Sequence, residues 1–274
     1  MTELRDKRMA IVGVGLMGGL LLDRLLAAGT CSKERIIACE PRLERREEIA
    51  EWQGVTATAD NRQAAEADAI VLAVPPGEVL PVLRELAPLL RPGQLVVSVA
   101  AAVPLAAMEQ AVGDGIAVVW ALPNSPALIG QGVTPVVYGR TMTPETRALA
   151  EELLACWGEA VEVPHKLMNL CVGLTAAAPT YIFPVIDALA EAGVKGGFPR
   201  DVALRLAAGV VRGSGALVLE TGQSPKALMA LTPLQPLRQA EARALFAEAV
   251  ETAQSKMACL QEKLGLQESR EEVV

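Results

Sequence analysis

A glycine-rich turn near the start of the chain has the spacing of a phosphate-binding site. The stretch GVGLMGG begins at Gly13 and follows a short apolar run that predicts a β-strand. Gly13 permits a tight turn, Gly15 lets the backbone approach a pyrophosphate, and Gly18 lets the following helix pack on the strand. The free N–H groups and the dipole at the start of that helix favour phosphate, so Leu16 and Met17 belong to the predicted site.

An acidic residue stands at the end of the second predicted strand. The run RIIACE ends in Glu40, where a carboxylate accepts hydrogen bonds from the ribose hydroxyls of NAD and repels the 2′-phosphate of NADP. The order of strand, glycine turn, helix, strand and acid favours a dinucleotide site over a turn that merely needs glycine. Arg42, Arg45 and Arg46 follow, and they fit either the polar face of a surface helix or a partner for that phosphate. Glu40 favours NAD, with NADP as the alternative.

Short apolar runs rich in β-branched residues alternate with helix-length segments between Met9 and Val163. The runs are MAIVGV, RIIACE, GVTAT, AIVLAVP, QLVVSVA, IAVVWAL, TPVVYG and AVEVP. Strands that are apolar on consecutive positions belong to a parallel sheet covered on both faces. This half of the chain therefore predicts a doubly wound α/β domain.

After His165 the strand signals cease. Segments such as YIFPVIDALAEAGV, RDVALRLAAGVVRGSGALVLE and EARALFAEAVETAQSKMACLQEKLG carry apolar residues at three- and four-residue spacing, which predicts helices. The wide apolar stripe of the last helix is typical of a domain core and equally of a contact with a partner subunit.

Composition and charge limit the class of protein. The 274 residues carry a net charge of −7, with acidic residues spread along helices, which argues against nucleic acid or a membrane as partner. Five cysteines without a Cys-x-x-Cys pair indicate reduced thiols and no metal site. No apolar signal segment precedes the first strand, and Gly or Pro interrupts each long apolar stretch. We expect a soluble cytoplasmic protein whose acidic ending, QESREEVV, is a solvated tail.

Several further motifs occur together along the chain. They are Asn61 in TADN, AVPP, VSVAAAV, LPNSPALIGQGVT, APTYIF, TP at Thr232 and the long block GGFPRDVALRLAAGVVRGSGALVLETGQSPKAL, which is the most specific. With GVGLMGG, they make the chain resemble the pyrroline-5-carboxylate reductase family, whose members reduce a cyclic imine to proline, from Met9 to about Lys263. The resemblance implies a Rossmann domain, residues 1–164, followed by a helical domain, residues 165–274, through which two subunits dimerise.

The resemblance also implies residues that surround the nicotinamide cofactor. Asn61 corresponds to a contact with the adenine ribose, and Ala100 and Ala101 to the border between nicotinamide and substrate. Asn124 stands in a predicted turn near the nicotinamide. The segment that lines the cofactor consists of Ala73, Val74, Pro75 and Pro76.

The two substrate segments depart from the family pattern. The family's Ser-Gly-Ser-Gly-Pro-Ala-Tyr, which receives the substrate carboxylate, reads Thr-Ala-Ala-Ala-Pro-Thr-Tyr from Thr175 to Tyr181. The second serine and both glycines are lost, and the alanines are expected to tighten the helix at this break. The family's Ser-Pro-Gly-Gly-Thr-Thr reads Thr-Pro-Leu-Gln-Pro-Leu from Thr232, so both threonines are lost and Pro236 has no N–H to donate. Pro75 replaces a common lysine.

These departures predict a changed substrate. Each lost donor costs a buried carboxylate about 1–3 kcal/mol, whereas Ala177, Leu234 and Leu237 offer apolar contact. We therefore expect an NAD(P)H-dependent reductase of an imine less polar than pyrroline-5-carboxylate.

The reaction itself needs orientation of the two reactants and one proton. The predicted catalytic residues are Thr175 and Tyr181, either of which can supply that proton. His165, the single histidine, is not among the predicted catalytic residues, because a lone histidine at a domain boundary is more often structural or exposed. The predicted substrate-binding residues are Asn169, Ala177, Thr232, Leu234 and Gln235.

Two other classes of protein stay open. A prephenate-type or hydroxy-acid dehydrogenase, suggested by GLMGG and AVPP, needs a histidine base and an arginine, and only His165 with Arg205 or Arg212 could supply them. A non-catalytic dinucleotide-binding regulatory protein would explain the loss of both substrate threonines.

Overall fold

The computed structural model describes residues 3–266, which divide into two compact units. The first unit holds residues 3–177 and 250–266, and the second holds residues 178–249. The predicted domain boundary between residues 164 and 165 stays a prediction. The acidic ending QESREEVV lies outside the described residues.

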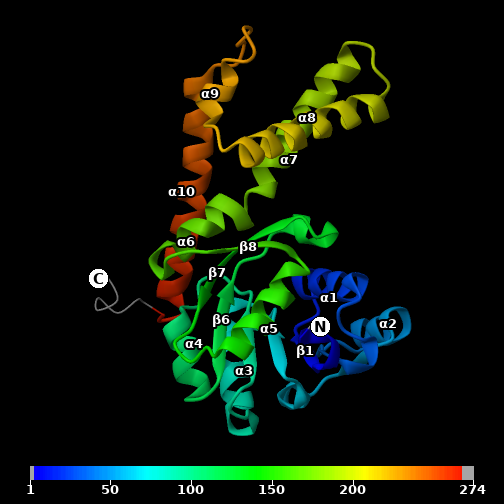
Figure 1. Cartoon of the computed structure of the whole chain (residues 1–274), viewed down its shortest axis with the longest axis vertical. Coiled ribbons are helices and arrows are strands. Elements are labelled where there is room, and N and C mark those ends of the chain that lie inside the picture. The colour runs from blue at the N-terminus through cyan, green and yellow to red at the C-terminus, as the bar shows by residue number, and fades with distance from the viewer. Residues whose placement is uncertain (1–2, 267–274) are drawn as a thin grey trace. The chain divides into compact units, whose positions relative to one another are not determined.

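An eight-stranded sheet forms the centre of the first unit (Figure 1). Each of the predicted apolar runs overlaps one strand. The strands are β1 (Met9–Val12), β2 (Ile36–Cys39), β3 (Thr56–Thr58), β4 (Ala69–Leu72), β5 (Leu95–Ser98), β6 (Ala117–Ala121), β7 (Gly132–Tyr138) and β8 (Gly158–Glu162). They lie in the order β3-β2-β1-β4-β5-β6-β7-β8.

Two strands, β7 and β8, run against the direction of the other six. β7 pairs antiparallel with β6, whereas the sequence pattern predicts a parallel sheet throughout. The reason is the connection between these strands, which holds only the short 3₁₀ turn Ser125–Ile129. A parallel neighbour needs a crossover of roughly a dozen residues or more, usually a helix. The helix α5 (Pro144–Ala155) provides such a crossover to β8, which is parallel to β7.

Helices cover both faces of the sheet, as predicted. Successive strand residues point to opposite faces, so Ile11 packs in one buried cluster and Val12 in the other. On the first face lie α1 (Leu16–Ala28), α2 (Leu43–Gln53) and α5. On the second lie α3 (Pro76–Leu86), α4 (Leu105–Val112) and α6 (Met168–Cys171).

A π-helical turn, Val172–Ala176, follows α6. It packs against the last part of α10 (Gln239–Lys263), which belongs to the first unit from Val250 onward. Gly173 allows this approach, because a Cβ there would lie 2.6 Å from the carbonyl oxygen of Val250.

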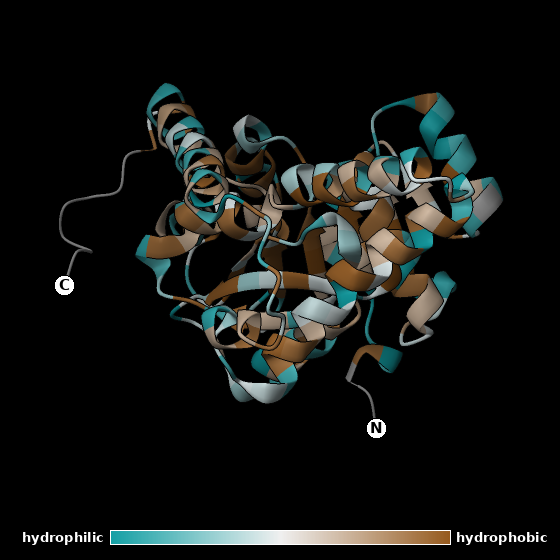
Figure 2. Cartoon of the chain, turned by 90° about the horizontal axis from the view of Figure 1, so that it is seen from above, coloured by the Kyte–Doolittle hydropathy of each residue, from teal (hydrophilic) through white to brown (hydrophobic). Residues whose placement is uncertain are grey.

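The second unit, residues 178–249 of the described chain, consists of helices joined by loops and contains no strand, as predicted. It contains α7 (Pro179–Lys195), α8 (Arg200–Thr221), α9 (Pro225–Met229) and the start of α10. Its buried cluster is small, formed by Ala190, Ala203 and Ala207 with Ile186 and Val194 against them. Large apolar side chains are exposed instead, among them Phe183, Leu189, Phe198, Leu204, Leu206, Val210, Leu217 and Leu219. Figure 2 colours each residue by hydropathy and shows hydrophobic and hydrophilic residues alternating along the helical ribbons.

Two helical stretches, His165–Lys195 and Arg200–Thr221, are long and apolar enough to cross a membrane by length and composition alone. Helices inside water-soluble proteins pass the same test. The predicted absence of a membrane partner therefore stays a prediction.

Candidate dinucleotide and substrate sites

The glycine turn after β1 has the geometry that its sequence predicts. Gly13 has a φ of +86°, and a Cβ there would lie 2.9 Å from the carbonyl oxygen of Ala73. A Cβ at Gly18 would lie 1.9 Å from the carbonyl oxygen of Gly13. Side chains at these positions would push apart the turn, α1 and the end of β4, so glycine is required at both.

Gly15 differs from these two because it faces open space. A Cβ there would have no heavy atom within 4 Å, and Gly15 is also the N-cap of α1. That helix has no acidic residue in its first turn and no side-chain cap. The first N–H groups of a helix have no acceptor within it, so those of Leu16 and Met17 can donate to an anion. The turn therefore fits the pyrophosphate of a dinucleotide.

A cleft of about 430 Å³ lies beside the turn, within the roughly 300–1,000 Å³ usual for small-molecule sites. It lies at the carboxyl ends of β1, β2 and β4, where the strand order reverses and α/β sheets bind ligands. The predicted cofactor residues that line it are Gly13, Gly15, Glu40, Asn61, Ala73, Val74 and Pro75. Those that lie outside its lining are Leu16, Met17, Gly18, Pro76, Ala100, Ala101 and Asn124.

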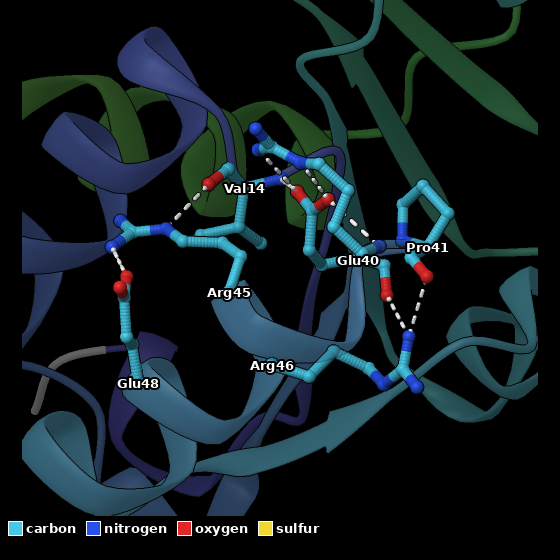
Figure 3. A network of polar contacts seen from close by, with 7 residues as sticks. Val14, Glu40, Pro41, Arg45, Arg46 and Glu48 are labelled. Atoms are coloured by element: carbon cyan, nitrogen blue, oxygen red, sulfur yellow. Dashed lines mark hydrogen bonds and ion pairs between the residues drawn. The ribbon is translucent and has the colours of Figure 1, made fainter.

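Glu40 is 3% exposed, and its carboxylate accepts four hydrogen bonds (Figure 3). The N–H of Val14 donates to Oε2 over 3.2 Å. Arg42 donates to Oε1 through its backbone N–H (3.2 Å) and Nε (2.7 Å), and to Oε2 through Nη2 (3.3 Å). Burial raises the pKa of Glu40, but the bonds from Arg42 and Val14 and the charge of Arg42 outweigh it, so the pKa is lowered. The carboxylate is ionised at neutral pH.

Two further arginines bind backbone near this pair, Arg45 at the glycine turn and Arg46 after β2 (Figure 3). Arg45 donates from Nε to the carbonyl oxygen of Val14 over 3.2 Å and pairs with Glu48 over 2.8 Å. Arg46 donates to two backbone carbonyls just after β2, over 3.0 and 2.6 Å. The ion pair of Arg45 with Glu48 agrees with the predicted polar face of a surface helix. Arg42 differs, because it is the N-cap of α2 and pairs with Glu40.

Asn124 and Ala100 are tied into the fold by hydrogen bonds. Asn124 accepts a bond from the N–H of Val133 (3.1 Å) and donates to the carbonyl oxygen of Thr175 (3.3 Å). The indole of Trp120 donates to the carbonyl oxygen of Ala100 over 2.8 Å. The side chain of Asn124 thus joins β7 to the π-helical turn, and its contact with nicotinamide stays a prediction.

The predicted substrate loop is helical at its start: Thr175 and Ala176 end the π-helical turn, and a bend at Ala177 and a turn at Ala178 precede α7. The hydroxyl of Thr175 donates to the carbonyl oxygen of Cys171 over 2.7 Å, and the N–H of Ala177 donates to that of Val172, also over 2.7 Å. Ala177 has φ −86° and ψ −15°, in the right-handed helical region. This agrees with the helix-forming tendency of the alanines.

The remaining predicted substrate and catalytic residues belong to the second unit. Tyr181 packs edge-on against Phe246 with ring centroids 6.0 Å apart, and burial raises its pKa. Its hydroxyl is buried and has no hydrogen-bond partner among residues 3–266. Thr232, Leu234 and Gln235 are exposed between α9 and α10. Asn169, Thr175 and Ala177 lie in the first unit, so a shared role for the two groups stays a prediction.

Gln261 in α10 is a buried polar residue that the sequence interpretation missed. It is 7% exposed, and its Oε1 accepts a hydrogen bond from the amide of Asn169 over 2.8 Å. The other amide atoms of both residues, Asn169 Oδ1 and Gln261 Nε2, are buried without a partner in the described part of the chain. A signal was present, because Gln261 lies four residues after Met257 and three before Leu264, on an apolar helix stripe.

His165, which the sequence interpretation left out of the site, packs at a tilt on the buried ring of Trp120, with centroids 5.7 Å apart. Within residues 3–266 no group of three or more His, Cys, Asp or Glu side chains could hold a metal ion.

Comparisons with known proteins agree with this geometry. Residues 8–102 match the family model for NADP oxidoreductases, coenzyme F420-dependent, and residues 165–260 match that for pyrroline-5-carboxylate reductase dimerisation. The pyrroline-5-carboxylate reductase of Escherichia coli (strain K12) is 34% identical over 267 residues, covering 95% of this chain and 99% of the relative. That of Methanosarcina acetivorans is 34% identical over 257 residues, covering 90% and 95%.

A solved structure shows the same fold. The crystal structure of Plasmodium falciparum pyrroline carboxylate reductase, which has NADP bound, superposes with a TM-score of 0.83 at 23% identity, covering 94% of this chain and 99% of that one. A dinucleotide cleft on a Rossmann sheet, joined to a helical dimerisation domain, defines an NAD(P)-dependent oxidoreductase. The chain belongs to the pyrroline-5-carboxylate reductase family, and the bond on which it acts is C=N.

The comparisons decide between the classes of protein that the sequence leaves open. They confirm the predicted family, the fold and the NAD(P)-dependent reduction of an imine. They do not favour the prephenate-type, hydroxy-acid or non-catalytic alternatives. The match to the dimerisation domain supports a homodimer.

Proposed function

We propose that this chain uses NAD(P)H to reduce a cyclic imine whose substituent is less polar than the carboxylate of pyrroline-5-carboxylate. The observation that carries the proposal is the use of hydrogen-bond donors at the π-helical turn. The hydroxyl of Thr175 and the N–H of Ala177 both donate to carbonyl oxygens within the helix. A substrate carboxylate therefore finds these donors already engaged, and each missing bond costs a desolvated carboxylate about 1–3 kcal/mol.

The second substrate segment supports the same proposal. Pro236 has no N–H, and the side chains of Leu234 and Leu237 are 76% and 69% exposed. Exposed leucines gain free energy by covering an apolar substituent, whereas they offer an anion nothing.

The proposal assigns each of these residues a role in the reaction. The nicotinamide supplies the hydride. Tyr181 supplies the proton, because its hydroxyl has no protein acceptor in the described chain while that of Thr175 donates to Cys171. Substrate is oriented by Asn169, Ala177, Thr232, Leu234 and Gln235.

Steady-state oxidation of NADPH and NADH by the purified chain tests the substrate. We expect kcat/KM for 2-methyl-1-pyrroline, which has no carboxylate, to exceed that for pyrroline-5-carboxylate. The triple variant Ala176→Gly, Ala177→Ser, Ala178→Gly restores the donors of the family loop, so its kcat/KM for pyrroline-5-carboxylate should rise about tenfold, equivalent to one recovered hydrogen bond. Ala155→Ser, on an exposed position of α5, is the matched control and should change neither value.

A kcat/KM for pyrroline-5-carboxylate that exceeds the value for the apolar imine would contradict the changed substrate. The chain would then share the substrate that names its relatives.

We further infer that the chain associates with itself through α7, α8 and α10, and that it works in the cytoplasm without a nucleic-acid or membrane partner. The exposed apolar side chains of α7 and α8 support the first inference. The five cysteines, all free, and the net charge of −7 support the second.

A further inference from the structure

Glu40 has no acceptor position left for a ribose. An ionised carboxylate offers about four acceptor sites, and here Val14 and Arg42 fill two on each oxygen. The prediction that Glu40 favours NAD treats its carboxylate as free to accept bonds from ribose hydroxyls. In the structure those hydroxyls could reach Glu40 only after the Arg42 side chain had moved away.

Arg42 is placed to meet the cofactor itself. Its side chain is 65% exposed, whereas that of Glu40 is 3% exposed, so the arginine is the partner that faces the ligand. Arg42 lines the dinucleotide cleft and also a second hollow at the start of α1, together with Gly15 and Arg45. A guanidinium carries five N–H donors, and the pair with Glu40 uses two of them, one on Nε and one on Nη2.

The 2′-position is the only place where NAD and NADP differ, and the two groups there need opposite partners. A hydroxyl needs a free acceptor, and a phosphate needs donors and positive charge. While Arg42 is paired with Glu40, its positive charge neutralises the carboxylate. The three guanidinium N–H groups that do not bind Glu40 remain available to a phosphate. The same contact therefore removes the acceptor for NAD and supplies the donors for NADP.

We propose that Arg42 determines the choice of cofactor in this chain: paired with Glu40, it binds the 2′-phosphate and makes NADP(H) the preferred dinucleotide despite the glutamate at the end of β2. The proposal rests on the nicotinamide-dependent function described above. Arg45, whose guanidinium lies at the same turn, adds positive charge but is held by Val14 and Glu48.

Equilibrium binding to the full-length protein tests this without turnover. The dissociation constants for NADPH and NADH are measured by titration calorimetry for the natural chain and for Arg42→Ala. We expect the constant for NADPH to rise about tenfold or more, as for the loss of a charge-assisted hydrogen bond, and that for NADH to stay the same or fall. Arg42→Lys keeps the positive charge but cannot make the bidentate contact. Its dissociation constant for NADPH should lie between that of the natural chain and that of Arg42→Ala.

Arg140→Ala is the matched control. Arg140 is likewise an exposed arginine, paired with a largely buried glutamate, Glu109, over 3.1 Å, and it lines neither the cleft nor the second hollow. This variant removes the same charge and should leave both constants unchanged. Circular dichroism confirms that each variant is folded before it is titrated.

Arg42→Ala overturns the inference if it leaves the ratio of the two constants unchanged, either because neither moves or because both rise together. A preference of the natural chain for NADH overturns it as well. If the natural chain binds neither dinucleotide, the proposed function fails with it, so the two failures are distinguishable.

Discussion

At the scale of single residues, Ala102 occupies a backbone conformation that alanine avoids. It has a φ of +64°, the one positive value at a non-glycine residue in the described chain. For an L-residue this left-handed region costs about 1–2 kcal/mol, and such strain clusters near functional sites. Ala102 is fully buried beside Ala100 and Ala101, the predicted border of the nicotinamide.

The strain predicts that glycine costs less stability at position 102 than at position 100. Ala102→Gly loses a buried methyl group and relieves the backbone, so the free energy of unfolding should change by less than about 0.5 kcal/mol. Ala100→Gly loses the same methyl group without relief and should destabilise by about 1–1.5 kcal/mol. Urea unfolding of both variants measures the difference. Equal losses would show that position 102 carries no strain.

At the scale of elements, the approach of α10 to the π-helical turn depends on Gly173. In Gly173→Ala the new methyl group would lie 2.6 Å from the oxygen of Val250 and 2.9 Å from its Cα, and backbone atoms cannot easily move aside. We expect a loss of about 1–3 kcal/mol in unfolding free energy, despite the better helix propensity of alanine.

Gly77→Ala is the control for this prediction, because position 77 approaches Leu264, the residue that follows α10. Its new Cβ would meet Leu264 at 3.6 Å, an ordinary contact, so its stability should hold or rise. Chemical unfolding compares the two variants, and a similar effect of both would refute the close approach at Gly173.

The sequence predicts these elements unequally well, for physical reasons. The central strands β1, β4, β5 and β6 are buried on both faces, so their apolar runs stand out in the sequence. The edge strands β3 and β8 are more exposed, but their short β-branched runs are also found as strands. The direction of β7 depends on the length of a connection and not on composition, and the pattern of runs does not contain it. The glycine turn is predictable because steric limits fix its residues, whereas the pair of Glu40 with Arg42 depends on side-chain positions that spacing does not specify.

At the scale of the whole molecule, the apolar helices of the second unit need a cover that residues 3–266 do not supply. Leu206, Val210 and Leu217 follow one stripe of α8 and are 56%, 58% and 41% exposed. By length and composition α8 could also enter a bilayer. The match of residues 165–260 to a dimerisation domain favours a second copy as the cover.

The double variant Leu206→Glu, Val210→Glu separates these two environments. Because both side chains are exposed within the chain, the charges should leave its fold intact and prevent association, which buried charges oppose by several kcal/mol. Light scattering after size exclusion should give twice the chain mass for the natural protein and the Gln223→Glu control, and a single chain mass for the double variant. None of the three should float with phosphatidylcholine vesicles on a density gradient. A natural protein that floats, or a double variant that remains dimeric, would place the cover of α8 elsewhere.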